Sequence, residues 1–86
     1  MKVRIPTPLR SYTGGAANVT AEGATVDELF VDLDRRFPGL RFRVIDEQGR
    51  LRQHMNVFVG EERCRDLSTP LDGIDEVVVM QALSGG

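Results

Sequence analysis

The stretch at residues 25–39, TVDELFVDLDRRFPG, decides the fold because it contains every signal of one amphipathic helix. Thr25 is a good N-cap residue, and Glu28 three positions later completes a capping box. Pro38 and Gly39 end the helical pattern. The apolar residues recur at helical spacing and form one stripe, which consists of Val26, Leu29, Phe30, Leu33 and Phe37. The stretch therefore predicts a helix with one buried face.

The residues before this helix predict two paired strands. Residues 2–5, KVRI, alternate polar and apolar side chains, which is the period of a half-buried strand. Pro6 and Pro8 lack backbone donors and end that strand. A turn at residues 13–15, TGG, leads into a second strand at 17–21, with Val19 facing inward, so a hairpin is expected.

Three further strands are predicted after the helix. Residues 55–59 place Met55, Val57 and Val59 on one face and Phe58 on the other. A short strand at 63–65 and a brief helical turn at 68–71 follow. Residues 76–82 contain four consecutive apolar residues, which is typical of a central strand.

The order of these elements predicts an α+β fold, with a mixed sheet of four to five strands packed on one main helix. The last strand can lie beside the first and parallel to it, as in the ubiquitin-like β-grasp. Residues 40–46 stay ambiguous, because RFRV alternates like a strand while Leu40 and Val44 are one helical turn apart. We expect one domain over residues 1–86, with a flexible tail at 83–86.

Size and composition exclude several classes of protein. The chain has 86 residues and a net charge of −2. So short a chain leaves little room for a catalytic apparatus beside its core, so we expect a protein that is not an enzyme. We also expect it to be monomeric when free. The acidic balance argues against nucleic acid. Cys64 is the only cysteine, which disfavours disulfides and metal sites. Without a membrane-spanning run or signal peptide, we expect a cytoplasmic protein.

Few side chains suggest chemistry of their own. His54 has no nucleophile beside it in sequence, and a solvent-facing histidine is the simpler interpretation. The arginines beside Cys64 could favour its thiolate, although an inert, half-buried thiol on a short strand is the simpler interpretation. An acidic group before the last strand, Asp72, Asp75 and Glu76, is interpreted as a solvated turn. Ten of the eleven basic residues are arginine, which serve solubility or dock to an acidic partner surface.

The C-terminal residues suggest chemistry carried out by a partner. The predicted last strand passes into Leu83-Ser84-Gly85-Gly86. A tail almost without side chains can thread into the narrow active site of another enzyme. A carboxylate presented there becomes a good acyl donor once it is joined to AMP.

The sequence resembles the ubiquitin-fold sulfur carriers, which include the small subunit of molybdopterin synthase and the carriers of thiazole and bacterial cysteine synthesis. The pieces that carry the resemblance are IPTPLR at 5–10, TGG at 13–15, FPGL at 37–40, DEQGRLR at 46–52, NVFV at 56–59, DEV at 75–77 and GG at 85–86. The first and fourth of these look most like the cysteine-synthesis branch.

The resemblance implies that Gly86 is the reacting residue and that Gly85 and Ser84 thread into the partner. A ubiquitin-activating-type adenylyltransferase and sulfurtransferase would use ATP and magnesium to activate Gly86, and sulfur would replace the adenylate. The thiocarboxylate would then feed a downstream sulfur-acceptor synthase, for cysteine, molybdenum cofactor or another sulfur metabolite. No cofactor or metal is expected on the carrier itself.

The sequence leaves three alternatives open. By analogy, Phe58, Met80 and Leu83 would contact the partner, although Phe58 could instead pack under residues 40–52. The activated Gly86 could form an isopeptide bond with target lysines, which would make the chain a protein modifier. A plain interaction domain without tail chemistry would tolerate loss of Gly86.

Overall fold

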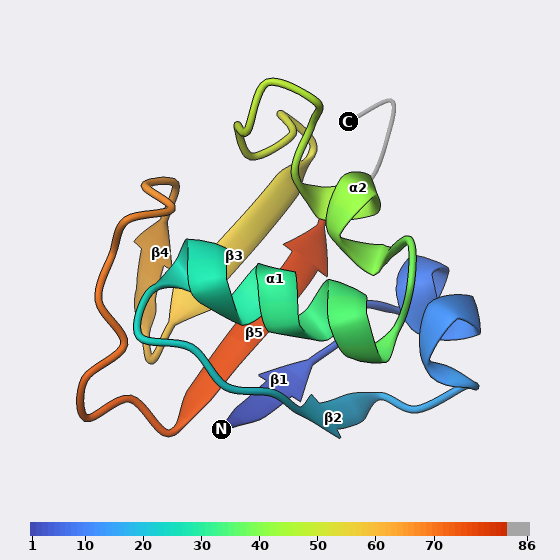
Figure 1. The fold of residues 1–86 in the computed structure, drawn as a ribbon, viewed down its shortest axis with the longest axis horizontal. Coiled ribbons are helices and arrows are strands. Elements are labelled where there is room, and N and C mark those ends of the chain that lie inside the picture. The colour runs from blue at the N-terminus through green and yellow to red at the C-terminus, as the bar shows by residue number, and fades with distance from the viewer. Residues whose placement is uncertain (83–86) are drawn as a thin grey trace.

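A computed structural model describes residues 1–82, which form one mixed sheet with helices on one face (Figure 1). The strands are β1 (Lys2–Arg4), β2 (Asn18–Thr20), β3 (Met55–Val59), β4 (Glu62–Cys64) and β5 (Glu76–Gln81). The helices are the 3-10 helix η1 (Thr7–Thr13), α1 (Val26–Arg36) and α2 (Leu40–Val44). Within residues 1–82, no helix is long and apolar enough to cross a membrane.

The sheet has the predicted β-grasp topology. Its strand order is β2-β1-β5-β3-β4, and β5 pairs parallel with β1 and antiparallel with β3. The long route from β4 brings the last strand between the first strand and β3, so the two segments most distant in sequence form the centre. The Val-rich composition of β5 fits that position, because a central strand has neighbours on both edges.

Helix α1 begins where the sequence predicts it. The Thr25 hydroxyl accepts a hydrogen bond from the backbone N–H of Glu28 at 3.2 Å. The Glu28 carboxylate in turn accepts from the N–H of Ala24 at 3.3 Å, one residue before the usual partner of a capping box. The stripe is buried against the sheet apart from Phe37, which is partly buried. The helix therefore uses one face to close the core.

Two predictions near the chain's turns need correction. β1 and β2 do pair antiparallel, but a 3-10 helix rather than a simple hairpin turn connects them. Leu9 buries its side chain in the core, and this contact stabilises the helix that follows Pro6 and contains Pro8 in its first turn. The brief helical turn expected at 68–71 is displaced: the N–H of Thr69 donates to the carbonyl of Asp66 at 3.1 Å and closes a turn at 66–69, whereas Pro70 forms an isolated bridge with Thr25.

The ambiguous segment at 40–46 is resolved as helix α2. Leu40 and Val44 are both buried, as expected for one helical turn facing the core. The Asp34 carboxylate accepts from the backbone N–H groups of Gly39 and Arg41, at 3.0 and 3.3 Å, and so satisfies donors at the start of this helix. Packing against α1 thus decides between two local patterns of equal strength.

Candidate functional site

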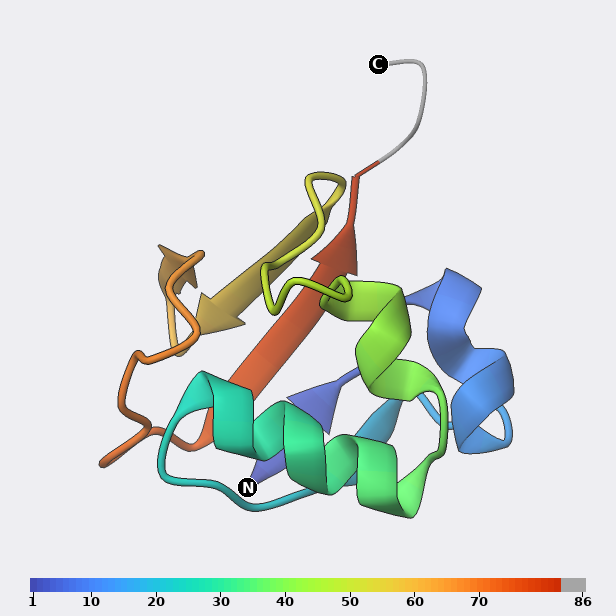
Figure 2. The ribbon, with the colours of Figure 1, turned by 45° about the horizontal axis from the view of Figure 1, so that its top comes forward.

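The central strand β5 delivers the C-terminal segment to one edge of the molecule. Gln81 pairs with Met55 in the β3 register, and the N–H of Ala82 donates to the carbonyl of His54 at 2.7 Å. The chain is therefore held by backbone hydrogen bonds up to Ala82, beside α2 and η1 (Figure 2). The predicted reacting residue Gly86, the threading residues Gly85 and Ser84, and the predicted partner contact Leu83 lie outside the described residues.

The face of the sheet that no helix covers is called here the open face. It is formed by alternate residues of β1, β3 and β5, namely Arg4, Asn56, Phe58, Val78 and Met80. Phe58 lies opposite Val78 in the register, and Met80 lies opposite Asn56. Met80 is 50% exposed, whereas Phe58 and Val78 are partly buried. The strand period thus brings Phe58 and Met80 to one accessible apolar surface.

The position of Phe58 excludes one alternative. Its neighbours Val57 and Val59 belong to the core, whereas Phe58 is absent from the core cluster and from the residues packed against it. Residues Val44, Ile45 and Leu51 of the 40–52 segment are buried on the helix side. Phe58 therefore does not pack under that segment.

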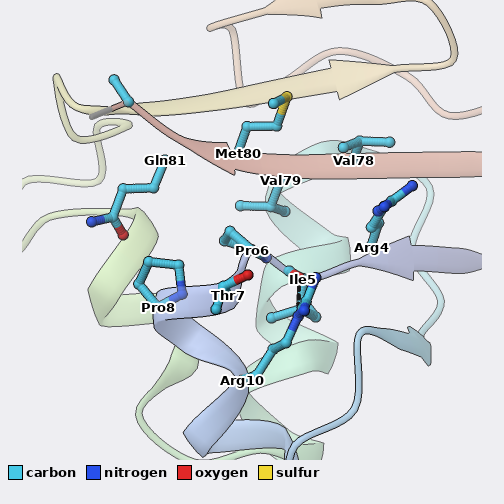
Figure 3. A pocket seen from close by; sticks show the side chains of 11 residues that line it. Arg4, Ile5, Pro6, Thr7, Pro8, Arg10, Val78, Val79, Met80 and Gln81 are labelled. Carbon is cyan, nitrogen blue, oxygen red and sulfur yellow. Dashed lines mark hydrogen bonds between the residues drawn. The ribbon is translucent and has the colours of Figure 1, made fainter. Parts of the chain in front are cut away.

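A cleft adjoins the open face at the end of β5 (Figure 3). Its volume is about 710 Å³, and it lies between the start of η1 and residues 78–82. Ile5 and Val79 are buried in the core, while Arg4 and Arg10 are at its polar side. The Nε of Arg10 donates to the carbonyl of Ile5 at 3.0 Å, which fixes the guanidinium at the cleft. From the sequence, Pro6 and Pro8 were interpreted only as the end of the first strand, and this cleft was not predicted.

The remaining candidate side chains do not assemble into a reactive centre. His54 is exposed, and its carbonyl rather than its ring binds Ala82. The Sγ of Cys64 donates to the carbonyl of Asp66 at 3.1 Å and lies 2.8 Å from the Thr69 hydroxyl. Within the part of the chain described, no three His, Cys, Asp or Glu residues are grouped so as to hold a metal ion.

Three carboxyl groups have pKa values below their usual range, and all three stabilise the backbone. The N–H of Arg50 lowers the pKa of Asp46, and Ser68 lowers that of Asp66 through its hydroxyl and N–H. The N–H of Glu22 and the side chains of Arg35 and Arg36 lower the pKa of Asp32 to about 2. Ionised carboxylates that accept such bonds serve local structure, so these shifts do not indicate acid–base catalysis.

The parallel β1–β5 pair, the helix across one face and the open face beside the end of β5 define a ubiquitin-like β-grasp protein. The model of the ThiS family matches residues 3–86, and the chain belongs to this family. The family consists of small carriers rather than enzymes, which confirms the expectation drawn from the size of the chain.

Individual relatives agree with this assignment. The chain is 35% identical to the sulfur carrier protein CysO of Mycobacterium tuberculosis, and the match covers 98% of this chain and 96% of that protein. A chain of the Amycolatopsis orientalis BexX/CysO complex is 37% identical, with a TM-score of 0.89 and coverage of 99% and 98%. SAMP1 of Haloferax volcanii, a small archaeal modifier protein, is 28% identical, with a TM-score of 0.78 and coverage of 100% and 98%. The chain is thus a CysO-like member of the family.

Proposed function

We propose that this protein carries sulfur as a thiocarboxylate on Gly86. The observation that supports this most strongly is the 35% identity to a sulfur carrier over nearly the whole chain, together with a sequence that continues from β5 to Gly85-Gly86. In the proposed cycle, the Gly86 carboxylate attacks the α-phosphate of ATP on an activating enzyme, and pyrophosphate leaves. Hydrosulfide or an equivalent sulfur nucleophile then attacks the acyl carbon, and AMP leaves.

The carrier's contribution is recognition and reach. Residues 83–86 can span roughly 13 Å when extended, which suffices to enter a narrow active site while the domain stays outside. The open face, with Phe58 and Met80, is the surface we assign to the activating enzyme and to the downstream sulfur-acceptor synthase. ATP and magnesium act on the partner, and the cytoplasm is the compartment proposed for the cycle.

Intact-protein mass spectrometry tests the proposal. The protein is incubated with a ubiquitin-activating-type enzyme from the same source, ATP, magnesium and sulfide. We expect a mass increase equal to replacing one oxygen by one sulfur, and we expect the variant without Gly86 to show none. An unchanged mass with an activating enzyme of demonstrated activity on another carrier would refute the proposal.

The similarity to SAMP1 favours protein modification as a second candidate. In that case, the lysine amine of a target protein attacks the Gly86 acyl adenylate and forms an isopeptide bond as AMP leaves. Lys2, the only lysine of the chain, pairs with Glu76 at 3.4 Å. Adducts joining Gly86 to target lysines in cell extracts, lost on deletion of Gly86, would support this candidate over sulfur transfer alone.

A further inference from the structure

Two clefts flank the end of β5, and each is lined by two arginines. The cleft of Figure 3 contains Arg4 and Arg10. A second cleft of about 380 Å³ contains Arg43 and Arg52, and it shares Pro8 and Gln81 with the first. We call Arg4, Arg10, Arg43 and Arg52 the basic collar. Among the residues described, no carboxylate lines either cleft.

Two members of the collar, Arg10 and Arg52, are held by hydrogen bonds to backbone carbonyls. The Nε of Arg10 donates to the carbonyl of Ile5 at 3.0 Å, and the Nε of Arg52 donates to the carbonyl of Phe42 at 2.8 Å. The Arg52 guanidinium also lies over the Phe42 ring, 4.7 Å from its centroid. These contacts hold each guanidinium in place and use only one of its five donors.

The outer ends of both guanidinium groups are left without partners in the domain. Within residues 1–82, the Nη atoms of Arg10 and Arg52 make no hydrogen bond, and no collar arginine forms an ion pair. By contrast, Arg35 and Arg36 on α1 share Asp32. A guanidinium fork that is fixed but unpaired matches the two oxygens of a carboxylate.

Charge is distributed unequally along β5. Asp72, Asp75 and Glu76 lie at its start, and the N–H of Gly60 donates to the carbonyl of Glu76 at 3.1 Å, which brings Glu61 and Glu62 to the same end. The collar lies at the other end, where Ala82 leads to the C-terminal residues. The carboxylate of Asp46 interacts electrostatically with Arg52 there, but it accepts its hydrogen bonds from the N–H groups of Gln48 and Arg50. A protein with net charge −2 thus concentrates unpaired positive charge beside the segment that its partner must receive.

We propose that the basic collar binds an acidic segment of the enzyme that receives the tail. Arg10 and Arg52 would each form a bidentate ion pair with a carboxylate of that segment. This inference rests on the proposed function for the identity of the partner. A protein segment fits better than nucleic acid, because the net charge of the chain is −2, the reverse of the basic balance that nucleic-acid-binding domains carry.

Fluorescence anisotropy with a labelled oligoglutamate peptide tests the collar directly. We expect the intact protein to bind the peptide in low salt and the double variant Arg10→Gln/Arg52→Gln to bind about tenfold more weakly, since an exposed ion pair contributes up to about fivefold. The matched control Arg50→Gln/Arg63→Gln removes two arginines that also lack ion pairs within residues 1–82, and should stay within about twofold. Equal weakening of both variants would overturn the proposal.

A lysine variant separates the guanidinium fork from mere charge. Arg10→Lys/Arg52→Lys keeps both charges but loses the Nε anchors and the bidentate geometry, so we expect it to bind nearly as weakly as the glutamine variant. Binding equal to that of the unmodified protein would overturn the proposed bidentate contacts of the two arginines. Tighter binding of an oligothymidylate of equal charge than of the peptide would instead indicate a nucleic-acid surface and would also overturn the proposal.

Deletion of Gly86 separates this inference from the proposed function. We expect that deletion to abolish sulfur loading and to leave peptide binding unchanged. With the activating enzyme, the collar variant should raise the KM for the carrier and leave kcat unchanged, since it weakens docking but not the acyl chemistry. A lower kcat with an unchanged KM would contradict a docking role even if sulfur loading itself is established.

Discussion

The two faces of the sheet are determined by different physical requirements. The face under α1 and α2 is closed by fully buried residues such as Val3, Phe30 and Val77. The open face carries the half-exposed Met80 and the partly buried Phe58, with Arg4 beside them. Stability therefore depends mainly on the covered face, and the open face and the adjoining end of β5 are available for recognition.

The largest loss of stability should follow from removing a side chain at the centre of the covered face. Phe30→Ala leaves a cavity between α1 and the sheet and should lower the free energy of unfolding by about 3–5 kcal/mol in urea titrations. Val31→Ala, on the exposed side of the same helix, should change it by less than about 0.5 kcal/mol. Similar losses for both variants would contradict the assigned orientation of α1.

A smaller loss should follow from adding one methyl group at Gly23. A Cβ at this position would lie 2.4 Å from the backbone nitrogen of Leu29, so the segment before α1 must move away from the helix. We expect Gly23→Ala to cost about 1–3 kcal/mol, as overpacking does, measured by the same titration. Ser11→Ala, at an exposed residue of η1, is the control and should leave the midpoint nearly unchanged. An unchanged midpoint for Gly23→Ala would show that the close approach is absent.

The helix cap should contribute less than either packing feature. Thr25→Ala removes the acceptor for the N–H of Glu28 and should cost about 1 kcal/mol. Thr25→Ser keeps a hydroxyl and should recover most of this loss. If the serine variant were as unstable as the alanine variant, the methyl group rather than the hydrogen bond would be responsible.

The carboxylate of Asp32 should produce a stability difference that depends on pH. Its pKa is lowered to about 2 from 3.8, first by the N–H of Glu22 and then by Arg35 and Arg36. The folded state thus prefers the ionised form, so its contribution is complete above pH 4 and is lost as the pH falls through about 2. The Tm difference between Asp32→Asn and the unmodified protein should therefore shrink from pH 5 to pH 2. A constant difference would exclude this linkage.

The helix and strands that form the covered face were predicted from the sequence more accurately than the candidate site. Helix α1 and strand β3 were predicted at nearly their observed bounds, because capping and side-chain periodicity are local signals. The strand predicted at 63–65 is β4, shifted by one residue to Glu62–Cys64. Helix α2 stayed ambiguous because its conformation depends on packing against α1 and on hydrogen bonds to the Asp34 carboxylate, and the alternation of residues 40–46 does not show either contact.

The collar could not be predicted because its members come from separate segments. Arg41 and Arg43 are two residues apart in the sequence, yet the structure gives them different surroundings. Arg41 bonds Asp27 at 3.2 Å, whereas Arg43 lines the cleft beside Arg52. Only the packing of β1, η1, α2 and the segment before β3 around the end of β5 brings these arginines together.

The smallest effect on stability, and a large effect on function, is expected on the open face. Met80→Ser removes apolar surface from a side chain that is already 50% exposed, so the urea midpoint should change little. If the open face docks the activating enzyme, the same change removes apolar contact from the interface and should raise the KM for sulfur loading severalfold. Val31→Ser, at a similarly exposed residue on α1, is the control, because it lies on the other side of the molecule from the open face. A raised KM for Val31→Ser but not for Met80→Ser would move the docking surface to the helices and reverse the roles assigned to the two faces.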